Sequence, residues 1–325
     1  MTLARRTFLH LAAGAAALPA VSGIAGAQTY PSRPVRIIVP FAAGGGTDIT
    51  ARVIAQWLSE RLGQQFIVEN RPGGGTNIGT EAAAKATADG YTLLMVGTSN
   101  TANVSLYDKL NFDLIRDFAP VAGVIRAPHV VVVNLAMPVK TIPEFIAYAK
   151  ANPGKVNMAS AGNGTAGHLG GELFKMLTGV NIQHVPYRGG GPALLDLIAG
   201  QVQVYFAGMP EAIEYVRTGK VRALAVGTAM RADALPDIPT VGEFVPGCES
   251  SIWFGVNAPK GTPVEIIDQL NRAINTALAD PAIKARYAEL GSTVFPTVPA
   301  EFGKFIAAET EKWGRVVKFA GLKAE

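Results

Sequence analysis

The chain has 325 residues, of which 49% are hydrophobic and 17% charged, so it has enough length and apolar material for two globular domains. Its formal net charge of +4, without runs of like charge or interleaved aromatic and basic residues, gives no support to nucleic-acid binding. The single cysteine, Cys248, cannot form an internal disulfide, and together with four histidines it shows no metal-ligand spacing.

The first 27 residues have the pattern of an export signal. A twin-arginine motif at 5–9 (RRTFL) precedes an alanine- and leucine-rich core at 9–18, and small residues at 25–27 suit a cleavage site. A membrane anchor is the alternative, but Gly14 and Pro19 interrupt the core, which is shorter than the roughly 20 residues of a bilayer span. We expect a twin-arginine-type signal peptide, cleaved after about Ala27, and a periplasmic protein.

After this segment, short apolar runs alternate with helical periodicity. Val35–Val39 predicts a buried strand, and residues 48–62 place apolar side chains on one helical face that ends at Gly63. Further strands are expected at 66–68, 92–96, 121–125, 130–133, 156–159, 183–186, 202–206 and 221–226. Further helices are expected at 77–87, 142–151, 165–177, 210–217, 264–279, 281–290 and 300–320, with one more ending at Ala199, and a polar loop is expected at 97–101.

Three glycine-containing segments resemble one another, and each follows a predicted strand. They are residues 44–49 (GGGTDI), 73–78 (GGGTNI) and 160–165 (SAGNGT), and a helical pattern comes next in each case. Glycine lets a ligand approach the backbone, and a helix that starts there presents free N–H groups and a partial positive charge. Because ligands of α/β sheets bind at the carboxyl ends of the strands, these loops predict a site for a small anion.

The alternation predicts an α/β fold with parallel-rich sheets flanked by helices. The alternation of predicted strands and helices is interrupted near 126–130 and again near 226–240, where a polar stretch contains Pro236 and Pro239. We therefore expect a domain inserted into another. The first domain would comprise residues 28–127 and 228–325 and the second residues 128–227, with a ligand cleft between them.

No catalytic motif stands out. The chain lacks a G-x-S-x-G nucleophile elbow, a P-loop lysine and a full dinucleotide fingerprint, which favours binding without chemistry and predicts no cofactor. Asp48 either contacts a ligand or stabilises a helix N-terminus. Thr47, Thr76 and Thr165 either cap helices or offer hydroxyls to a ligand.

Two longer side chains are further candidates. His168 lies one turn into the helix after the third loop, where it either faces the ligand or is an ordinary packed or surface histidine. Arg188 follows a strand and starts a glycine loop, where it either pairs with a carboxylate or lies at the surface. His129 and His184 are strand-edge residues for which the sequence suggests no partner.

A set of short motifs, in order along nearly all of the chain, resembles one known family. They are 40–48 (PFAAGGGTD), 69–75 (ENRPGGG), 89–94 (DGYTLL), 151–155 (ANPGK), 160–165 (SAGNGT), 185–189 (VPYRG), 235–241 (LPDIPTV), 253–255 (WFG) and 258–263 (APKGTP). The sequence is similar to the Bordetella uptake gene (Bug) family of periplasmic solute-binding receptors, which serve tripartite tricarboxylate transporters.

The resemblance implies a two-domain periplasmic binding protein of the Venus flytrap, type II-like kind, with a ligand carboxylate held by backbone N–H groups and ordered waters. Carried over to this chain, the first-domain contacts would be Ala43, Gly44, Gly45, Thr47, Asp48, Thr76, Asn77 and Ser99. The second-domain contacts would be Ser160, Gly162, Thr165 and His168, with Tyr187 or Arg188 close by.

One departure from the family bears on the ligand. Many relatives carry an aspartate after the strand that ends here at Phe206, where this chain has Ala207. A ligand ammonium group would lose that anionic partner, which favours a carboxylate without an amino group. Phe41, Phe206 and Met209 offer apolar walls, so an aromatic carboxylate is also compatible with the sequence.

The expected function is that of a monomeric receptor that captures a small carboxylate and delivers it to the membrane subunits of a tripartite tricarboxylate transporter. An exported enzyme acting on a phosphate or acyl compound is an alternative, for which His168 is the one candidate general base. A sensor subunit that presents its ligand to a signalling partner is another.

Overall fold

The computed structural model describes residues 30–319 and 321–322, so the expected signal peptide and its cleavage site lie outside the described residues. The strands are β1 (Val35–Val39), β2 (Phe66–Asn70), β3 (Thr92–Gly97), β4 (Phe118–Val133), β5 (Asn157–Ser160), β6 (Gln183–Pro186), β7 (Val204–Gly208), β8 (Arg222–Val226), β9 (Ser251–Pro259) and β10 (Thr293–Val294). The α-helices are α2 (Gly46–Leu62), α3 (Asn77–Ala84), α4 (Thr98–Leu106), α5 (Ile142–Ala151), α6 (Ala166–Thr178), α7 (Gly190–Ile198), α8 (Met209–Arg217), α9 (Val264–Ala279), α10 (Pro281–Glu289) and α11 (Pro299–Phe319).

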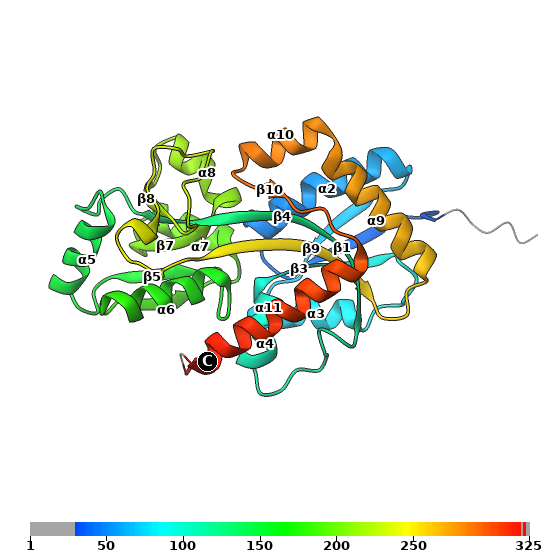
Figure 1. The fold of residues 1–325 in the computed structure, drawn as a ribbon, viewed down its shortest axis with the longest axis horizontal. Helices are drawn as coiled ribbons and strands as arrows, with labels where there is room; N and C mark the ends of the chain where they lie inside the picture. The colour runs from blue at the N-terminus through cyan, green and yellow to red at the C-terminus, as the bar shows by residue number, and fades with distance from the viewer. Residues whose placement is uncertain (1–29, 320, 323–325) are drawn as a thin grey trace, which may run out of the picture.

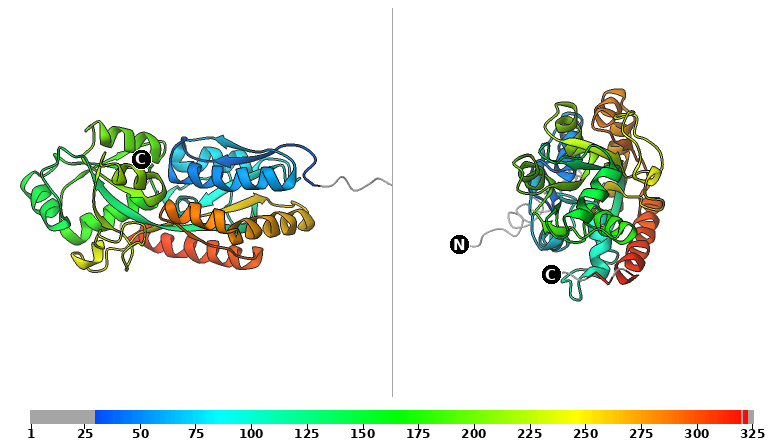
Figure 2. Two further views of the ribbon diagram at one scale, coloured as in Figure 1. Left: turned by 90° about the horizontal axis from the view of Figure 1, so that it is seen from above. Right: turned by 90° about the vertical axis from the view of Figure 1, so that its left-hand side faces the viewer.

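Two lobes lie side by side, joined by the long strands β4 and β9 (Figure 1). The N-terminal segments (blue) and the C-terminal helices (orange and red) share one lobe, and the middle of the chain (green) forms the other (Figure 2). The strand order β2-β1-β3-β9-β4-β7-β5-β6 runs from one lobe into the other, with β8 and β10 pairing to β4. The expectation of an α/β fold in two parts is therefore met.

Buried strands explain the core of the first lobe. β1 reads VRIIV and pairs in parallel with β2 and β3. Successive side chains of a strand face opposite sides, so Ile37 packs in the cluster that contains α2 and α9. Ile38 packs in the cluster that contains α3 and α11. Helices thus cover both faces, as the continuous apolar run predicts.

The sheet is mixed rather than mainly parallel. β1 pairs in parallel with β2 and β3, and β5 pairs in parallel with β6 and β7. Where the chain passes between the lobes, however, β4 pairs antiparallel with β7, β8, β9 and β10, and β3 pairs antiparallel with β9. The parallel pairs therefore flank an antiparallel centre.

Two expectations about the crossing strands were wrong. Separate strands were expected at 121–125 and 130–133, but they form the single strand β4, because β9 pairs with it through Arg126, Ala127 and Pro128. No strand was expected at β9, whose residues are buried from Ile252 to Pro259 and show no polar alternation. Gly255 permits a close approach there, since a Cβ would lie 2.2 Å from the Phe302 ring.

The expected polar loop at 97–101 is instead the start of α4. The Asn100 side chain accepts a hydrogen bond from the Gly97 N–H at 2.9 Å and donates to Thr80 at 2.8 Å, which caps and anchors the helix. Polar side chains are buried here through these bonds, which the sequence pattern alone does not reveal.

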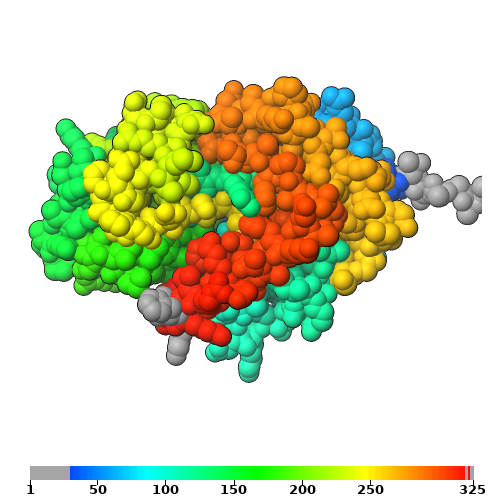
Figure 3. All heavy atoms as spheres, in the orientation of Figure 1, coloured from blue at the N-terminus to red at the C-terminus, as the bar shows by residue number. Residues whose placement is uncertain are grey.

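The long C-terminal helix α11 has the expected apolar face. Phe302, Ile306, Trp313 and Val317 are buried. Figure 3 shows α11 (red) on the surface, reaching from the first lobe to the second, and Trp313 packs with Leu169 of α6. None of the helices in the described part of the chain combines the length and apolar character needed to cross a membrane.

Candidate binding site between the lobes

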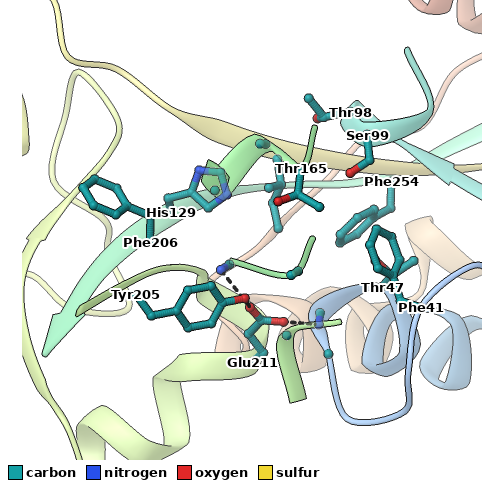
Figure 4. A pocket seen from close by; sticks show the side chains of 18 residues that line it. Phe41, Thr47, Thr98, Ser99, His129, Thr165, Tyr205, Phe206, Glu211 and Phe254 are labelled. Carbon is teal, nitrogen blue, oxygen red and sulfur yellow. Dashed lines mark hydrogen bonds between the residues drawn. The ribbon is translucent and has the colours of Figure 1, made fainter. Parts of the chain in front are cut away.

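A cavity of about 50 Å³ lies where the two lobes meet (Figure 4). Its walls come from both lobes and from the crossing strands. The lining residues are Phe41, Gly45, Gly46, Thr47, Thr98, Ser99, His129, Ala161, Thr165, Ala166, Gly167, Gly190, Tyr205, Phe206, Gly208, Glu211, Ile252 and Phe254. A space of this size holds a small molecule or a few waters.

Four helices begin at the cavity wall. α2 starts at Gly46, α4 at Thr98, α6 at Ala166 and α7 at Gly190, and all four residues line the cavity. N–H groups at a helix start carry partial positive charge and favour an anion. In the part of the chain that the structure describes, the lining residues include no lysine or arginine, and the positive potential at the wall comes from these backbone groups.

Hydroxyl groups lie at the same end of the cavity as two of these helix starts. Thr98 is 3% exposed, and its Oγ1 is buried with no hydrogen-bond partner among residues 30–319 and 321–322. Ser99 and Thr165 lie beside it, on α4 and at the cap of α6 (Figure 4). A buried hydroxyl without a partner carries an energetic cost, which a bound polar group would remove.

Apolar side chains and a neutral histidine form the other walls. Phe41, Phe206 and Phe254 line the cavity. His129 is 2% exposed, and its Nδ1 lies 3.0 Å from the Ser250 hydroxyl. Burial lowers the pKa of His129 to about 4, so the ring is uncharged at neutral pH.

One acid lies in the cavity wall. Glu211, near the start of α8 in the second lobe, accepts hydrogen bonds from Gly208 N–H at 3.1 Å, from the Tyr205 hydroxyl and, across the lobes, from Gly46 N–H at 2.6 Å. Burial raises the pKa of Glu211 and outweighs the three donors, which lower it. Burial and the neighbouring carboxylate also raise the pKa of Tyr205, so the phenol keeps its proton and donates it.

The two lobes contact each other directly beside the cavity. Ala42 N–H donates to the Arg188 carbonyl at 2.8 Å. A Cβ on Gly45 would lie 3.1 Å from the Gly190 nitrogen, so the glycine loops of the two lobes pack backbone to backbone. Together with the Glu211 bond to Gly46, these contacts hold the lobes in a closed arrangement.

The structure places six residues singled out from the sequence at the cavity wall: Phe41, Gly45, Thr47, Ser99, Thr165 and Phe206. It places the others around it. Ala43 lies at the lobe contact, since a Cβ on Gly191 would lie 2.4 Å from its carbonyl oxygen. Ala207 and Met209 are fully buried in the core.

Asp48 has a role inside its own loop. Its carboxylate accepts hydrogen bonds from Gly44 N–H at 3.0 Å, from Arg52 at 2.9 Å and from Asn70 at 2.9 Å. Burial raises the pKa of Asp48, but these donors outweigh it and the net shift is downward. Asp48 therefore fixes the first glycine loop, and the Gly44 N–H that it holds is not free for a ligand.

The second glycine loop lies away from the cavity. Asn103 donates to the Thr76 hydroxyl at 3.1 Å and to Asn77 at 3.0 Å. A Cβ on Gly75 would lie 3.2 Å from the Asn163 carbonyl oxygen. Thr76 and Asn77 thus join α3 to α4 and touch the loop of the other lobe outside the lining set.

Two histidines support the third loop. The His168 and His184 rings stack with their centroids 3.9 Å apart, and His184 Nε2 lies 2.6 Å from the Ser160 hydroxyl. His168 Nδ1 accepts from Gly164 N–H at 3.2 Å. Burial, the largest cause, lowers the pKa of His168 to about 4 and that of His184 to about 3.

The remaining candidates lie near this loop without lining the cavity. Ser160 Oγ and the Gly162 backbone bond to each other, which shapes the turn before α6. The Tyr187 hydroxyl donates to Asp196 at 2.7 Å, and the Arg188 side chain is exposed. Their part in ligand binding stays a prediction.

Several lining residues were not foreseen. Glu211 and Tyr205 follow no motif, and their relation to Gly46 exists only across the lobes. Thr98 belongs to a segment expected to be a loop, and His129 had no assigned partner. Within the described ranges, no group of three or more His, Cys, Asp or Glu side chains could hold a metal ion.

Known proteins resemble this chain over most of its length. BugT of Bordetella pertussis is 42% identical over 310 residues, which cover 94% of this chain and 95% of that protein. The structure "R. palustris Rpa4515 with adipate" is 37% identical with a TM-score of 0.88, covering 91% of this chain and 100% of that one. MatC of Rhodopseudomonas palustris, with bound malate, is 34% identical with a TM-score of 0.84, covering 89% and 100%.

The family described as "Tripartite tricarboxylate transporter family receptor" matches residues 50–322. The periplasmic binding protein BugD shares the fold with a TM-score of 0.88 at 35% identity, covering 91% of this chain and 100% of that one. The resemblance seen in the sequence and the expected two-domain binding-protein fold are thereby confirmed. This chain belongs to the tripartite tricarboxylate transporter receptor family, whose members are periplasmic solute-binding receptors and not enzymes.

Proposed function

We propose that this receptor captures a small carboxylate in the cavity between its lobes and delivers it to the membrane subunits of a tripartite tricarboxylate transporter. The observation that carries the proposal is the unpartnered Thr98 hydroxyl, buried in a wall where four helices begin. A carboxylate oxygen placed there accepts from the hydroxyl and is stabilised by the helix starts.

The two relatives with bound adipate and malate support the ligand class, because both compounds are carboxylates. Contacts to both lobes make a ligand favour the closed arrangement, by an amount set by its different affinities for the closed and open forms. The transporter would then receive the closed receptor. We further propose that the mature protein begins after about Ala27 and acts as a monomer.

The test starts from ligand-free protein, prepared by unfolding and refolding, with a panel of carboxylates in a thermal-shift assay. At a hundredfold excess over Kd, a ligand should stabilise the folded protein by about 2.7 kcal/mol. Mass spectrometry of the compound released from the protein as purified would name the natural ligand. If no carboxylate raises the melting temperature, the proposal is wrong.

A variant assigns the binding to the cavity. Thr98→Val removes the hydroxyl and keeps the side-chain shape, so Kd for the best carboxylate should rise roughly tenfold. Thr276→Val is the control, since its hydroxyl bonds to the Arg272 carbonyl on an exposed helix face. Equal affinities of the two variants would place the ligand elsewhere.

A further inference from the structure

The carboxylate of Glu211 is closely surrounded by backbone atoms of both lobes. Glycines of both lobes surround the group, and a Cβ on Gly190 would lie 2.0 Å from Oε2. A Cβ on Gly45 or on Gly46 would lie 3.3 Å or 3.6 Å from the same oxygen. Any side chain at Gly190 would therefore displace the acid from its present position.

The donors around Glu211 fit an ionised carboxylate that only accepts. Gly46 N–H and Gly208 N–H are fixed backbone donors, and the Tyr205 hydroxyl keeps its proton. These three groups approach the two oxygens and leave acceptor positions open. Since Glu211 also lines the cavity, a ligand meets an acceptor there, rather than another donor.

The opposite end of the cavity has the reverse character. Figure 4 shows Thr98, Ser99 and Thr165 on the side away from Glu211 and Tyr205. That end offers hydroxyls and the starts of α4 and α6, which suit one anionic group. The cavity is therefore polarised, with hydroxyls and the starts of α4 and α6 at one end and, at the other, a carboxylate that lies against the starts of α2 and α7.

The charge inside the cavity limits what a ligand can carry. Glu211 already occupies the start of α2, through the Gly46 N–H, and no lysine or arginine of the described residues lines the cavity. One ligand carboxylate can use the starts of α4 and α6. A second ligand carboxylate would face Glu211 with no cation between them, and like charges brought together in a closed site weaken binding.

We infer that Glu211 is a specificity-determining residue, which makes the receptor select ligands with one carboxylate and a hydroxyl or ammonium donor at the other end and reject dicarboxylates of the same length. The inference rests on the proposed function of the cavity. It also revises the expectation drawn from Ala207, because Glu211 supplies an acid that the sequence pattern at 206–208 lacks.

Matched ligand pairs test the inference without any variant. 4-Hydroxybutyrate and 4-aminobutyrate have the carbon-chain length of succinate, with a hydroxymethyl or an aminomethyl group in place of one carboxylate. 6-Hydroxyhexanoate is related to adipate in the same way. Calorimetric Kd values for wild-type protein at pH 7.5 should favour the donor-bearing member on the order of a hundredfold. Equal or tighter binding of the dicarboxylate by the wild type overturns the inference.

Glu211→Gln then assigns the discrimination to this residue. The variant keeps the size of the side chain and removes its charge, so succinate and adipate should gain affinity and the preference should shrink at least about tenfold. Glu214→Gln is the matched control on the same helix, with an exposed side chain that pairs only with Arg217 in the part of the chain described. Circular dichroism checks that each variant is folded.

The outcomes separate this inference from the proposal on which it rests. If dicarboxylates bind wild type and Glu211→Gln alike, the cavity binds carboxylates but Glu211 does not choose among them. If Glu211→Gln keeps the wild-type preference, the discrimination lies elsewhere and the inference is again wrong. If no compound of the panel binds either protein, the proposed function fails as well.

Discussion

The first two glycine loops share the letters GGGT, and the structure gives them different surroundings. The first follows β1, starts α2 and lines the cavity with Gly45, Gly46 and Thr47. The second follows β2 at the edge of the sheet, where Thr76 adopts a φ of 91° and Asn103 holds the loop. The same motif therefore serves a site or a scaffold according to where its strand lies in the sheet.

The test with the largest expected effect compares a glycine-to-alanine substitution in the first loop with one in the second loop. Gly45→Ala places a Cβ 3.1 Å from the Gly190 nitrogen, so it should hinder closure and weaken ligand binding by about 1–3 kcal/mol, roughly ten- to a hundredfold in Kd. Gly74→Ala, at a φ of 57°, should cost about 1 kcal/mol of folding stability and leave Kd unchanged. Calorimetry and urea unfolding measure both effects; a larger loss of affinity in Gly74→Ala would contradict the comparison.

The third loop should differ from the other two in its response to acid. His168 has a pKa of about 4 in the folded state and an ordinary value near 6.5 when unfolded. Between these values the unfolded chain binds more protons, so stability falls as pH drops from 6.5, by about 2 kcal/mol at pH 5 for this histidine alone. His184, with a pKa of about 3, adds a change of the same sign.

Urea unfolding at pH 7, 6 and 5 measures this dependence. The His168→Gln, His184→Gln double variant should show a flatter profile than wild type across that range. Equal slopes would mean that the stacked pair does not carry the effect. Buried His129 lies on β4 and keeps a share of the slope in both proteins.

Tyr205→Phe should have a smaller effect. The hydroxyl is one of three donors to Glu211, so its loss leaves a buried carboxylate short of a partner and costs about 1–2 kcal/mol of stability. The pKa of Glu211 should rise further, because that donor lowers it. Thermal unfolding and the pH dependence of succinate affinity measure these changes, and an unchanged melting temperature would argue against the bond.

The smallest effect is expected for Asp48→Asn. The amide keeps one acceptor but loses the charged bond to the half-exposed Arg52, and Gly44 N–H loses a strong partner, so we expect about 1 kcal/mol. Ligand affinity should change little if Asp48 only holds the loop. A loss of affinity as large as that of Gly45→Ala would instead indicate contact with the ligand.

Local periodicity predicted most of the elements, and its failures have a common cause. β9 is buried on both faces, so its residues show neither the alternation of a half-buried strand nor a helical spacing. β4 contains Arg126 and Pro128, which suggest a break, yet its pairing with β9 runs through both. Tertiary pairing decided these segments, and a single sequence contains no direct record of pairing.

The residues of the site also fall into two groups, those that the sequence predicted and those that only the structure shows. Glycine loops at strand ends are visible in the sequence, and three residues of these loops, Gly45, Thr47 and Thr165, lie in the cavity wall. Ser99, which also lines the cavity, was suggested by the family resemblance instead. Glu211 could not be found in that way, because it matters through Gly46, which is 165 positions away along the chain. Residues that act through contacts between the two lobes can be identified only when the three-dimensional arrangement of the lobes is known.

The pairing of β4 with β9 at the crossover between the lobes has a mechanical consequence. A receptor whose lobes are joined by a loose tether can swing open at almost no cost, but here Arg126, Ala127 and Pro128 remain in register with Trp253, Ile252 and Ser251 through the crossover. Opening must bend and twist these two paired strands. The elastic energy stored in them grows with the angle between the lobes. The stiffness of the two strands, rather than the flexibility of a single linker, would then set the opening angle of the ligand-free receptor.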